Sequence, residues 1–482
     1  MIFNKAELSK QNVVFFGWTQ TIYFILTSLL ITMIVYMFDG YTLLSIFLFS
    51  SVLYYLLTGT SDYKLGITSW VKGIPLYYGL MFLLLPLSNW IIQDIKSISE
   101  QEMAYALSVA TVGLIAFGVG TKLALRYHQN YYGFSTIKNT VFETIQQPRV
   151  LVSSLILGIL STFWSYFWGY YGLRDPSDDI GNTAGFISAL SFLLTMSHLA
   201  SWNVFFRTQD KKYLWMGLVS ANILLISGVF SNSKTALILP LFFIGISYWG
   251  VRGKFPYKLS LLSLLMFLFI AFPFVTVSRY VIFISGNNLS KLEIAKTTLD
   301  YLISFDWRNQ IESYSEYGVV KSMGRGLIEY FSVIIHETGK SVDFLYGKTF
   351  THGIEAFIPR FIYPEKLGLT IGNWTAQHYG LLSPDDIVTS VSPTLMGEFY
   401  MNYGVYGIII GMAFIGCLSV WIDRYIIISK DNWVMPYAIF CIGWQESLIG
   451  QTFIPFIKNI LFLWFVFFII YNITKISDAI KH

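Results

Sequence analysis

Charged side chains stand in apolar surroundings at several places in this sequence. Lys234, in the stretch SGVFSNSKTALILP, lies between two long apolar runs, and Arg279, Glu446 and Lys458 lie in similar surroundings. A lysine or arginine at the centre of a membrane costs about 2.5 to 3.5 kcal/mol, so such groups usually face a cavity or a partner. Lysine and arginine are also the side chains that bind phosphate oxygens through charge-assisted hydrogen bonds. The sequence therefore raises the question of a site for an anionic ligand.

Each of these residues also has a structural explanation. Arg279 and Lys458 could extend their charged ends to the lipid headgroups while their aliphatic stems stay in the membrane. Glu446 and Lys458 lie on adjacent predicted helices and could pair as a structural bridge. Lys234 could be a solvated lysine in a short turn.

Residues 282–396 carry further groups that could do chemistry. This stretch is rich in aromatic residues and holds three of the six histidines of the chain, His336, His352 and His378. Their spacing matches no zinc-binding pattern. The sequence also has no complete phosphate-binding P-loop and no G-x-S-x-G nucleophile elbow. We therefore expect no metal site, no cofactor and no nucleotide hydrolysis.

The elements that position these residues are predicted to be membrane helices. Of the 482 residues, 55% are hydrophobic and only 12% are charged, whereas about 25% of the residues of an ordinary soluble domain are charged. The net charge of +4 is too small to indicate binding to nucleic acid. Cys417 and Cys441 lie in apolar runs and are interpreted as small buried hydrophobic residues. The composition predicts an all-α polytopic membrane protein.

Runs of about 20 apolar residues, long enough to cross a hydrocarbon core of about 30 Å, predict about 12 membrane helices. The first lacks a cleavage-site pattern and is expected to be retained as a helix. The predicted division is nine helices in residues 1–281, one large outer loop at 282–396 that covers the site, and three helices with a cytoplasmic tail in 397–482. The helices are expected near residues 16–38, 41–58, 73–92, 103–125, 150–172, 184–206, 213–232, 235–251, 258–281, 397–421, 433–450 and 455–474.

The distribution of lysine and arginine predicts the orientation in the membrane. With the N-terminus inside, the short outer loops hold only Lys96, Arg174 and Lys234, and most other basic residues fall on the inner side. The positive-inside rule then predicts that both termini are cytoplasmic and that the loop 282–396 faces the outside, the periplasm of a bacterial cell. Lys234 and Arg279 would lie at the outer ends of their helices.

The outer loop is expected to be mostly helical. The stretch 324–346 is amphipathic, and as a helix it places Leu327, Tyr330, Phe331, Ile334 and Ile335 on one side. We expect this helix to lie against the membrane surface or to cap a cavity. Cations beside aromatic side chains at an outward-facing cavity suit an anionic lipid with a sugar head, because cations bind phosphate and aromatic faces stack on carbohydrate.

Three stretches resemble the superfamily of O-antigen polymerases (Wzy) and O-antigen ligases. FSNSKTALILPL at 230–241 is similar to a short outer turn that usually contains Ser-Arg, and IPRFIYPEKLG at 358–368 resembles a stretch of the polymerases' outer loop. SPTLMGEFYMNYGVYGIIIGM at 392–412 resembles the entry into the helix after that loop. Lys234 stands where the family usually has arginine, so it keeps the charge without the two-pronged hydrogen bonding of a guanidinium group.

The resemblance implies a glycosyltransferase-C-like fold and a reaction. A glycan linked to undecaprenyl diphosphate would be transferred to the terminal hydroxyl of a second lipid-linked repeat unit, and undecaprenyl diphosphate would leave. Lys234, Arg279 and Arg360 would then stabilise the leaving diphosphate. Glu398 or His352 would act as the general base for the acceptor hydroxyl. Tyr400 and Asn402 would orient sugar hydroxyls or, alternatively, serve helix entry and packing.

The same resemblance implies the setting and the partners. The enzyme would be a multi-pass protein of the bacterial inner membrane with its active site facing the periplasm. Its partners would be the lipid-linked donor and acceptor and the bilayer, and the resemblance also allows a chain-length regulator protein. Two alternatives stay open: an O-antigen ligase, which would transfer the finished chain to lipid A-core, and a transporter of lipid-linked oligosaccharides.

Overall fold

The computed structural model describes fifteen stretches of the chain, and in them the backbone forms α-helices, short π-helical segments and turns but no strand. The described residues are 40–59, 70–84, 99–130, 148–167, 190–230, 234–252, 256–271, 273–275, 277–278, 281, 289, 291–304, 327–355, 371–384 and 392–428.

Six helices in this part of the chain are long and apolar enough to cross a membrane. This confirms the prediction of an all-α protein with several membrane helices. The predicted spans at 16–38, 433–450 and 455–474 lie outside the described residues, so the total of about 12 and the glycosyltransferase-C-like arrangement stay predictions. The six are Gly40–Thr58, Glu100–Tyr127, Pro148–Ser165, Lys211–Phe230, Tyr257–Val275 and Thr394–Asp423.

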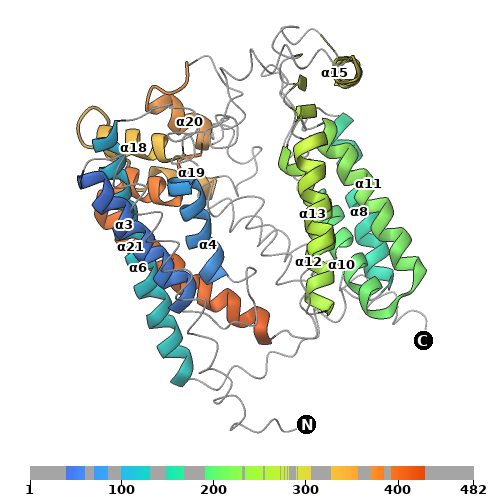
Figure 1. The fold of residues 1–482 in the computed structure, drawn as a ribbon, viewed down its shortest axis with the longest axis horizontal. Helices are drawn as coiled ribbons and strands as arrows, with labels where there is room; N and C mark the ends of the chain where they lie inside the picture. The colour runs from blue at the N-terminus through green and yellow to red at the C-terminus, as the bar shows by residue number, and fades with distance from the viewer. Residues whose placement is uncertain are drawn as a thin grey trace.

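A first helix group joins segments that are far apart in the sequence (Figure 1). The long helices α6 and α21 pack along each other, α3 packs against α6, and α4 contacts both α3 and α21. The π-helical η2 continues α4 directly. The members are α3 (Gly40–Gly59), α4 (Trp70–Gly79), η2 (Leu80–Leu84), α6 (Glu100–Asn130) and α21 (Thr394–Ile428).

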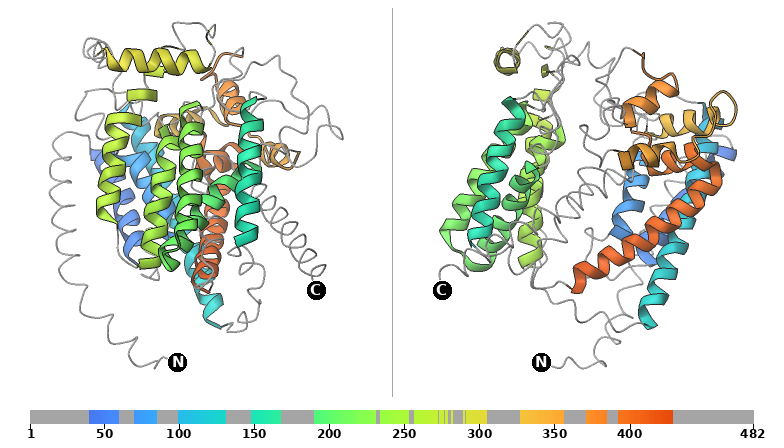
Figure 2. Two further views of the ribbon diagram at one scale, coloured as in Figure 1. Left: turned by 90° about the vertical axis from the view of Figure 1, so that its right-hand side faces the viewer. Right: turned by 180° about the vertical axis from the view of Figure 1, so that it is seen from behind.

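A second helix group is formed by consecutive segments. Its centre is α10, which contacts α8, α11 and α12, and α13 packs against α12. A further helix, α15, contacts α11 and runs across one end of this group (Figure 2). The members are α8 (Pro148–Phe167), α10 (Phe192–Thr208), α11 (Lys211–Phe230), α12 (Lys234–Arg252), α13 (Tyr257–Met266), η4 (Phe267–Ala271) and α15 (Lys291–Ile303).

Glycine allows the helices of each group to approach closely. A Cβ atom at Gly120 of α6 would overlap the carbonyl group of Ala413 in α21, and one at Gly158 of α8 would overlap the backbone of Leu194 in α10. Small residues at such contacts are typical of membrane helices, which associate through close packing because lipid provides no hydrophobic driving force between them.

Three helices of the predicted outer loop cover one end of the first group (Figure 1). They are α18 (Leu327–Glu337), α19 (Lys348–Glu355) and α20 (Ile371–His378). The expected apolar side of α18 is confirmed, because Tyr330, Phe331, Ile334 and Ile335 are buried. The helix is shorter than the predicted 324–346, since Gly339 adopts φ +83° and turns its N–H group to the carbonyl of Val342. It packs against α6, α21 and η2.

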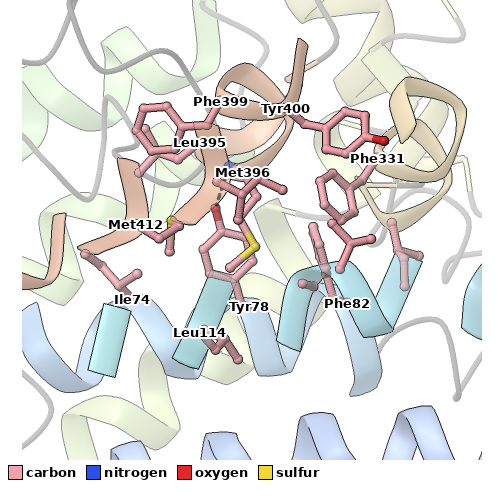
Figure 3. Packing of buried hydrophobic residues seen from close by; sticks show 14 of the residues in the cluster. Ile74, Tyr78, Phe82, Leu114, Phe331, Leu395, Met396, Phe399, Tyr400 and Met412 are labelled. Carbon is pink, nitrogen blue, oxygen red and sulfur yellow. Dashed lines mark hydrogen bonds between the residues drawn. The ribbon is translucent and has the colours of Figure 1, made fainter. Parts of the chain in front are cut away.

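The core of the first group lies under these loop helices. Figure 3 shows Phe82 beneath Phe331 of α18 and Tyr78 beneath Met396, at the start of α21. The rings of Phe82 and Phe331 have centroids 5.2 Å apart. The N–H group of Met396 donates to the Tyr78 hydroxyl at 3.3 Å. Aromatic packing and this hydrogen bond therefore fix the first turn of α21.

Candidate active site at the break in α21

The helix α21 is broken near its beginning. Tyr403 has φ −144° and ψ 19°, and Gly404 has φ 61° and ψ −146°, so neither residue is helical although α21 continues on both sides. The conformation of Gly404 is accessible almost only to glycine, because a Cβ atom would clash with the backbone there. The sequence NYGVYG therefore interrupts the helix at this glycine. We call Tyr403 and Gly404 the break.

Backbone groups next to the break bond to the outer-loop segment that precedes α19. The N–H group of Leu345 donates to the carbonyl of Met401 at 2.9 Å, and that of Tyr346 donates to the carbonyl of Asn402 at 3.2 Å. A helix interruption leaves carbonyl groups without their helical partners, and inside a membrane protein these groups need others. The segment 345–349, which we call the docking segment, supplies them.

The side chain of Asn402 extends this contact. Its Oδ1 atom accepts the N–H group of Gly347 at 2.7 Å. Its Nδ2 atom donates to Thr349 Oγ1 at 2.7 Å and to the carbonyl of Glu398 at 2.8 Å. Asn402 and Thr349 are both fully buried. In this arrangement the Asn402 amide makes its hydrogen bonds within the protein. The geometry therefore fits the alternative that Asn402 serves helix entry and packing better than it fits contact with a sugar.

Glu398 lies one turn before Asn402 and has no solvent-exposed surface. A buried carboxyl group is costly unless it is protonated or hydrogen-bonded, so its place in the helix is chemically unusual. An acceptor hydroxyl can reach this carboxyl only after the segments that cover it move. The general-base role predicted for Glu398 would therefore require a conformational step.

Tyr400 lies on the same turn and faces α18. Its side chain is 8% exposed, and its hydroxyl lies 3.5 Å from the carbonyl of Ile335. Figure 3 shows its ring beside Phe331. The residue therefore joins α21 to the loop helix, and its role toward a sugar stays a prediction.

The structure places the other predicted site residues in different parts of the chain. His352 belongs to α19, which contacts α21 and begins within the docking segment. Lys234 is the first residue of α12 in the second group. Arg279 and Arg360 lie outside the described residues. The structure thus brings together Glu398, Tyr400, Asn402 and the helix that carries His352, while Lys234 belongs to the other group.

Three residues separate Lys234, the first residue of α12, from the end of α11. The helix α11 ends at Phe230, and a Cβ atom at Gly228 would come within 2.9 Å of the Ala236 backbone. The predicted turn itself, residues 231–233, lies outside the described residues. The N-terminus of α12, at Lys234, carries the positive end of the helix dipole, which favours an anion.

The loop helices are joined to each other by aromatic residues. The Tyr379 hydroxyl, just after α20, bonds to Thr338 Oγ1 at 2.7 Å, and burial raises the pKa of Tyr379 to about 12. The ring of His378 stacks on Trp374 with centroids 5.3 Å apart. Burial, and then the charge of Lys348, lower the pKa of His378, while Asp343 opposes that shift. His378 therefore serves the packing of α20.

Two buried polar contacts were not predicted from the sequence. Asp423 of α21 accepts the N–H groups of Trp70 at 2.7 Å and Val71 at 3.2 Å, and so caps the start of α4. The ring of His198 in α10 lies 2.9 Å from Ser220 Oγ and 3.0 Å from the carbonyl of Pro240. One feature of the sequence could have indicated both contacts, because His198 and Asp423 are ionisable side chains within apolar runs.

Among the described residues, no group of three or more His, Cys, Asp and Glu side chains is arranged to hold a metal ion. Comparison of the chain with family models, with curated proteins and with solved structures found no match.

Proposed function

We propose that this protein is a membrane glycosyltransferase that polymerises oligosaccharide repeat units linked to a lipid diphosphate. The observation that carries the proposal is the break in α21, where a buried carboxyl, Glu398, lies one turn from a backbone contact with the outer loop. The contact joins a candidate base on a membrane helix to a helix, α19, that carries the second candidate, His352. The motif resemblance of 392–412 includes these same residues.

The proposed reaction is a displacement at the anomeric carbon of the donor. The acceptor hydroxyl oxygen forms the new bond to that carbon, the bond from carbon to the phosphate oxygen breaks, and the lipid diphosphate leaves with the electron pair. The hydroxyl proton passes to Glu398 or His352 as general base. Lys234, together with Arg279 and Arg360, stabilises the charge that develops on the leaving diphosphate.

The proposed setting follows the sequence prediction. The site would face the periplasm of a bacterial cell from its inner membrane, and the substrates would be undecaprenyl-diphosphate-linked oligosaccharides. A chain-length regulator would be an additional partner. The O-antigen ligase alternative shares the donor and differs in the acceptor.

The break in α21 also favours a second candidate, a transporter of the same lipid-linked oligosaccharide. Transporters bind substrates at discontinuous helices near the middle of the membrane, where the backbone groups freed by the interruption bind the ligand. Here the break lies in the first third of a 35-residue helix, and the docking segment already bonds to the carbonyls beside it. Both features favour the transferase.

Reconstitution tests the proposal directly. Purified protein in liposomes, given one defined lipid-diphosphate oligosaccharide, should produce a ladder of longer products on a gel. Glu398→Gln should lower the rate by about 10² to 10⁴-fold if this residue is the base, whereas Glu337→Gln in α18 should leave it unchanged. A single added unit would favour the ligase, and movement of unchanged substrate across the membrane without any product would favour the transporter.

A further inference from the structure

The contact between α21 and the docking segment is more extensive than a helix interruption requires. Backbone bonds from Leu345 and Tyr346 already occupy the carbonyls of Met401 and Asn402. The Asn402 side chain adds two further hydrogen bonds to the docking segment, both 2.7 Å long, and a third, 2.8 Å long, to the carbonyl of Glu398 within α21. Polar networks that are fully buried and fully satisfied make an arrangement rigid and specific.

The docking segment also contains two consecutive residues with left-handed backbone conformations. Tyr346 and Gly347 have φ values of 44° and 91°. A Cβ atom at Gly347 would lie 2.8 Å from the Tyr403 hydroxyl, so glycine is needed for the close approach as well as for the conformation. Tyr346 is not glycine and adopts a left-handed conformation at some energetic cost, which the surrounding contacts must offset.

The three hydrogen bonds of Asn402 connect two turns that carry candidate bases. One bond reaches the backbone of Glu398 on the same helix, and another reaches Thr349, the second residue of α19. His352 follows three residues later in α19. The hydroxyl of Thr349 is therefore the side-chain link between the turn of Glu398 and the helix of His352.

We propose that Asn402, Gly347 and Thr349 form a latch that positions α19, and with it His352, against the turn of α21 that carries Glu398. Thr349 is then a positioning residue, because it acts through Asn402 and the placement of α19. The role of Glu398 and His352 in this inference rests on the proposed function, whereas the latch itself is independent of it.

Hydrogen–deuterium exchange of the purified protein tests the latch without any substrate. Thr349→Val keeps the shape of the side chain and removes the acceptor for Asn402 Nδ2, so amide exchange in residues 345–347 should become about fivefold faster. Thr349→Ser should restore the wild-type rate. Thr351→Val is the matched control, because the exposed hydroxyl of Thr351 donates only within α19, to the carbonyl of Lys348.

The positioning role is tested with the same variants in the polymerisation assay. Thr349→Val should lower kcat about tenfold, because a small displacement of catalytic groups costs rate, and should leave KM for the lipid-linked substrate unchanged. Thr349→Ser should recover kcat. A purely structural Thr349 would give Thr349→Val less folded protein but the same kcat for each folded molecule.

Asn402→Asp is a stronger second variant. The carboxylate still accepts the N–H group of Gly347 but cannot donate to Thr349 or to the Glu398 carbonyl, so exchange in residues 345–347 should increase more than in Thr349→Val. If this variant does not fold, the test rests on Thr349→Val.

The possible results separate the two proposals. Unchanged exchange in Thr349→Val would overturn the latch, whatever its activity. Faster exchange with wild-type kcat would overturn the positioning role. A wild-type protein that makes no polymer would refute the proposed function, and the exchange data would still decide the latch.

Discussion

The first helix group buries acidic and amide side chains near the two ends of α21, whereas the second buries a histidine, His198, between the middles of its helices. Glu398 and Asn402 lie before the break in α21, and Asp423 lies near the other end of that helix. In the second group, His198 connects the interiors of α10, α11 and α12 through Ser220 and Pro240.

The partners of these side chains differ in the same way. Asn402 holds a segment of the outer loop, and Asp423 holds the first residues of another helix. His198 bonds only to neighbouring helices of its own group. Polar contacts therefore couple α21 to segments that are distant in the sequence, and in the second group they tie α12, the helix that begins with Lys234, to α10.

Among the tests of this comparison, Lys234→Ala gives the largest expected effect, and it tests whether the second group supplies a functional cation. If Lys234 stabilises the leaving diphosphate, the rate of polymerisation in liposomes should fall by about 10² to 10³-fold. Lys234→Arg should keep part of the activity, since the charge is retained. The control is Lys211→Ala at the exposed start of α11. Equal losses in Lys234→Ala and Lys234→Arg would contradict phosphate binding.

His198→Phe tests the support in the second group. The substitution leaves the Pro240 carbonyl without its ring N–H donor in a buried position, which should lower the free energy of unfolding by about 2 to 3 kcal/mol. Thermal unfolding in detergent measures the change. In the first group, Tyr78→Phe keeps the packed ring and removes a hydroxyl that bonds at the first turn of α21, including to the N–H group of Met396, so its loss should be smaller. A larger loss for Tyr78→Phe than for His198→Phe would contradict the view that His198 is the more important buried polar contact.

The substitutions Asp423→Asn and Asp210→Asn compare a buried and an exposed aspartate that each cap a helix. The carboxylate of Asp423 accepts two N–H groups in a buried position, and the amide should lower the free energy of unfolding by about 2 kcal/mol because one donor then faces another. Asp210 caps α11 at an exposed position through the N–H group of Lys212, and Asp210→Asn should cost about 0.5 kcal/mol. Thermal unfolding distinguishes these values, and equal losses would show that burial is irrelevant to the Asp423 cap.

The smallest expected effect is a pH dependence from His378. Its pKa is lowered, so the folded protein favours the neutral ring. As the pH falls through about 6.5, the ordinary value for histidine, the unfolded chain binds a proton that the folded protein resists, and stability decreases. The Tm of His378→Gln should therefore fall less between pH 7.5 and 5.5 than that of wild type. His336→Gln, at an exposed position of α18, is the control, and identical falls in all three proteins would refute the effect.

Local features of the sequence predict much of the fold. Apolar runs predict the long helices, and the turn before Lys234 follows from polar residues between two such runs. The amphipathic pattern also predicts the buried side of α18. Its end at Glu337 was missed, because the pattern of apolar residues continues past Gly339 while the backbone turns away.

Contacts between distant residues are less accessible to such reasoning. Gly404 is a visible signal for an interruption of α21, but nothing local shows that residues 345–349 dock there. Asp423 is likewise visible as a charge in an apolar run, yet its partners, Trp70 and Val71, lie more than 350 positions earlier. The contact of Asn402 reflects the same limit, since its partner Thr349 is 53 residues away.

The cap on α4 has a consequence for the order in which the two helix groups fold during synthesis. Trp70 and Val71 are synthesised long before Asp423, which accepts their N–H groups. The helix α6 is likewise synthesised long before α21, the helix against which it packs. The second group is made of consecutive segments and can assemble while translation continues. Because domains form as their residues become available, the second group should be complete first, and the first group should close around α21 only near the end of translation.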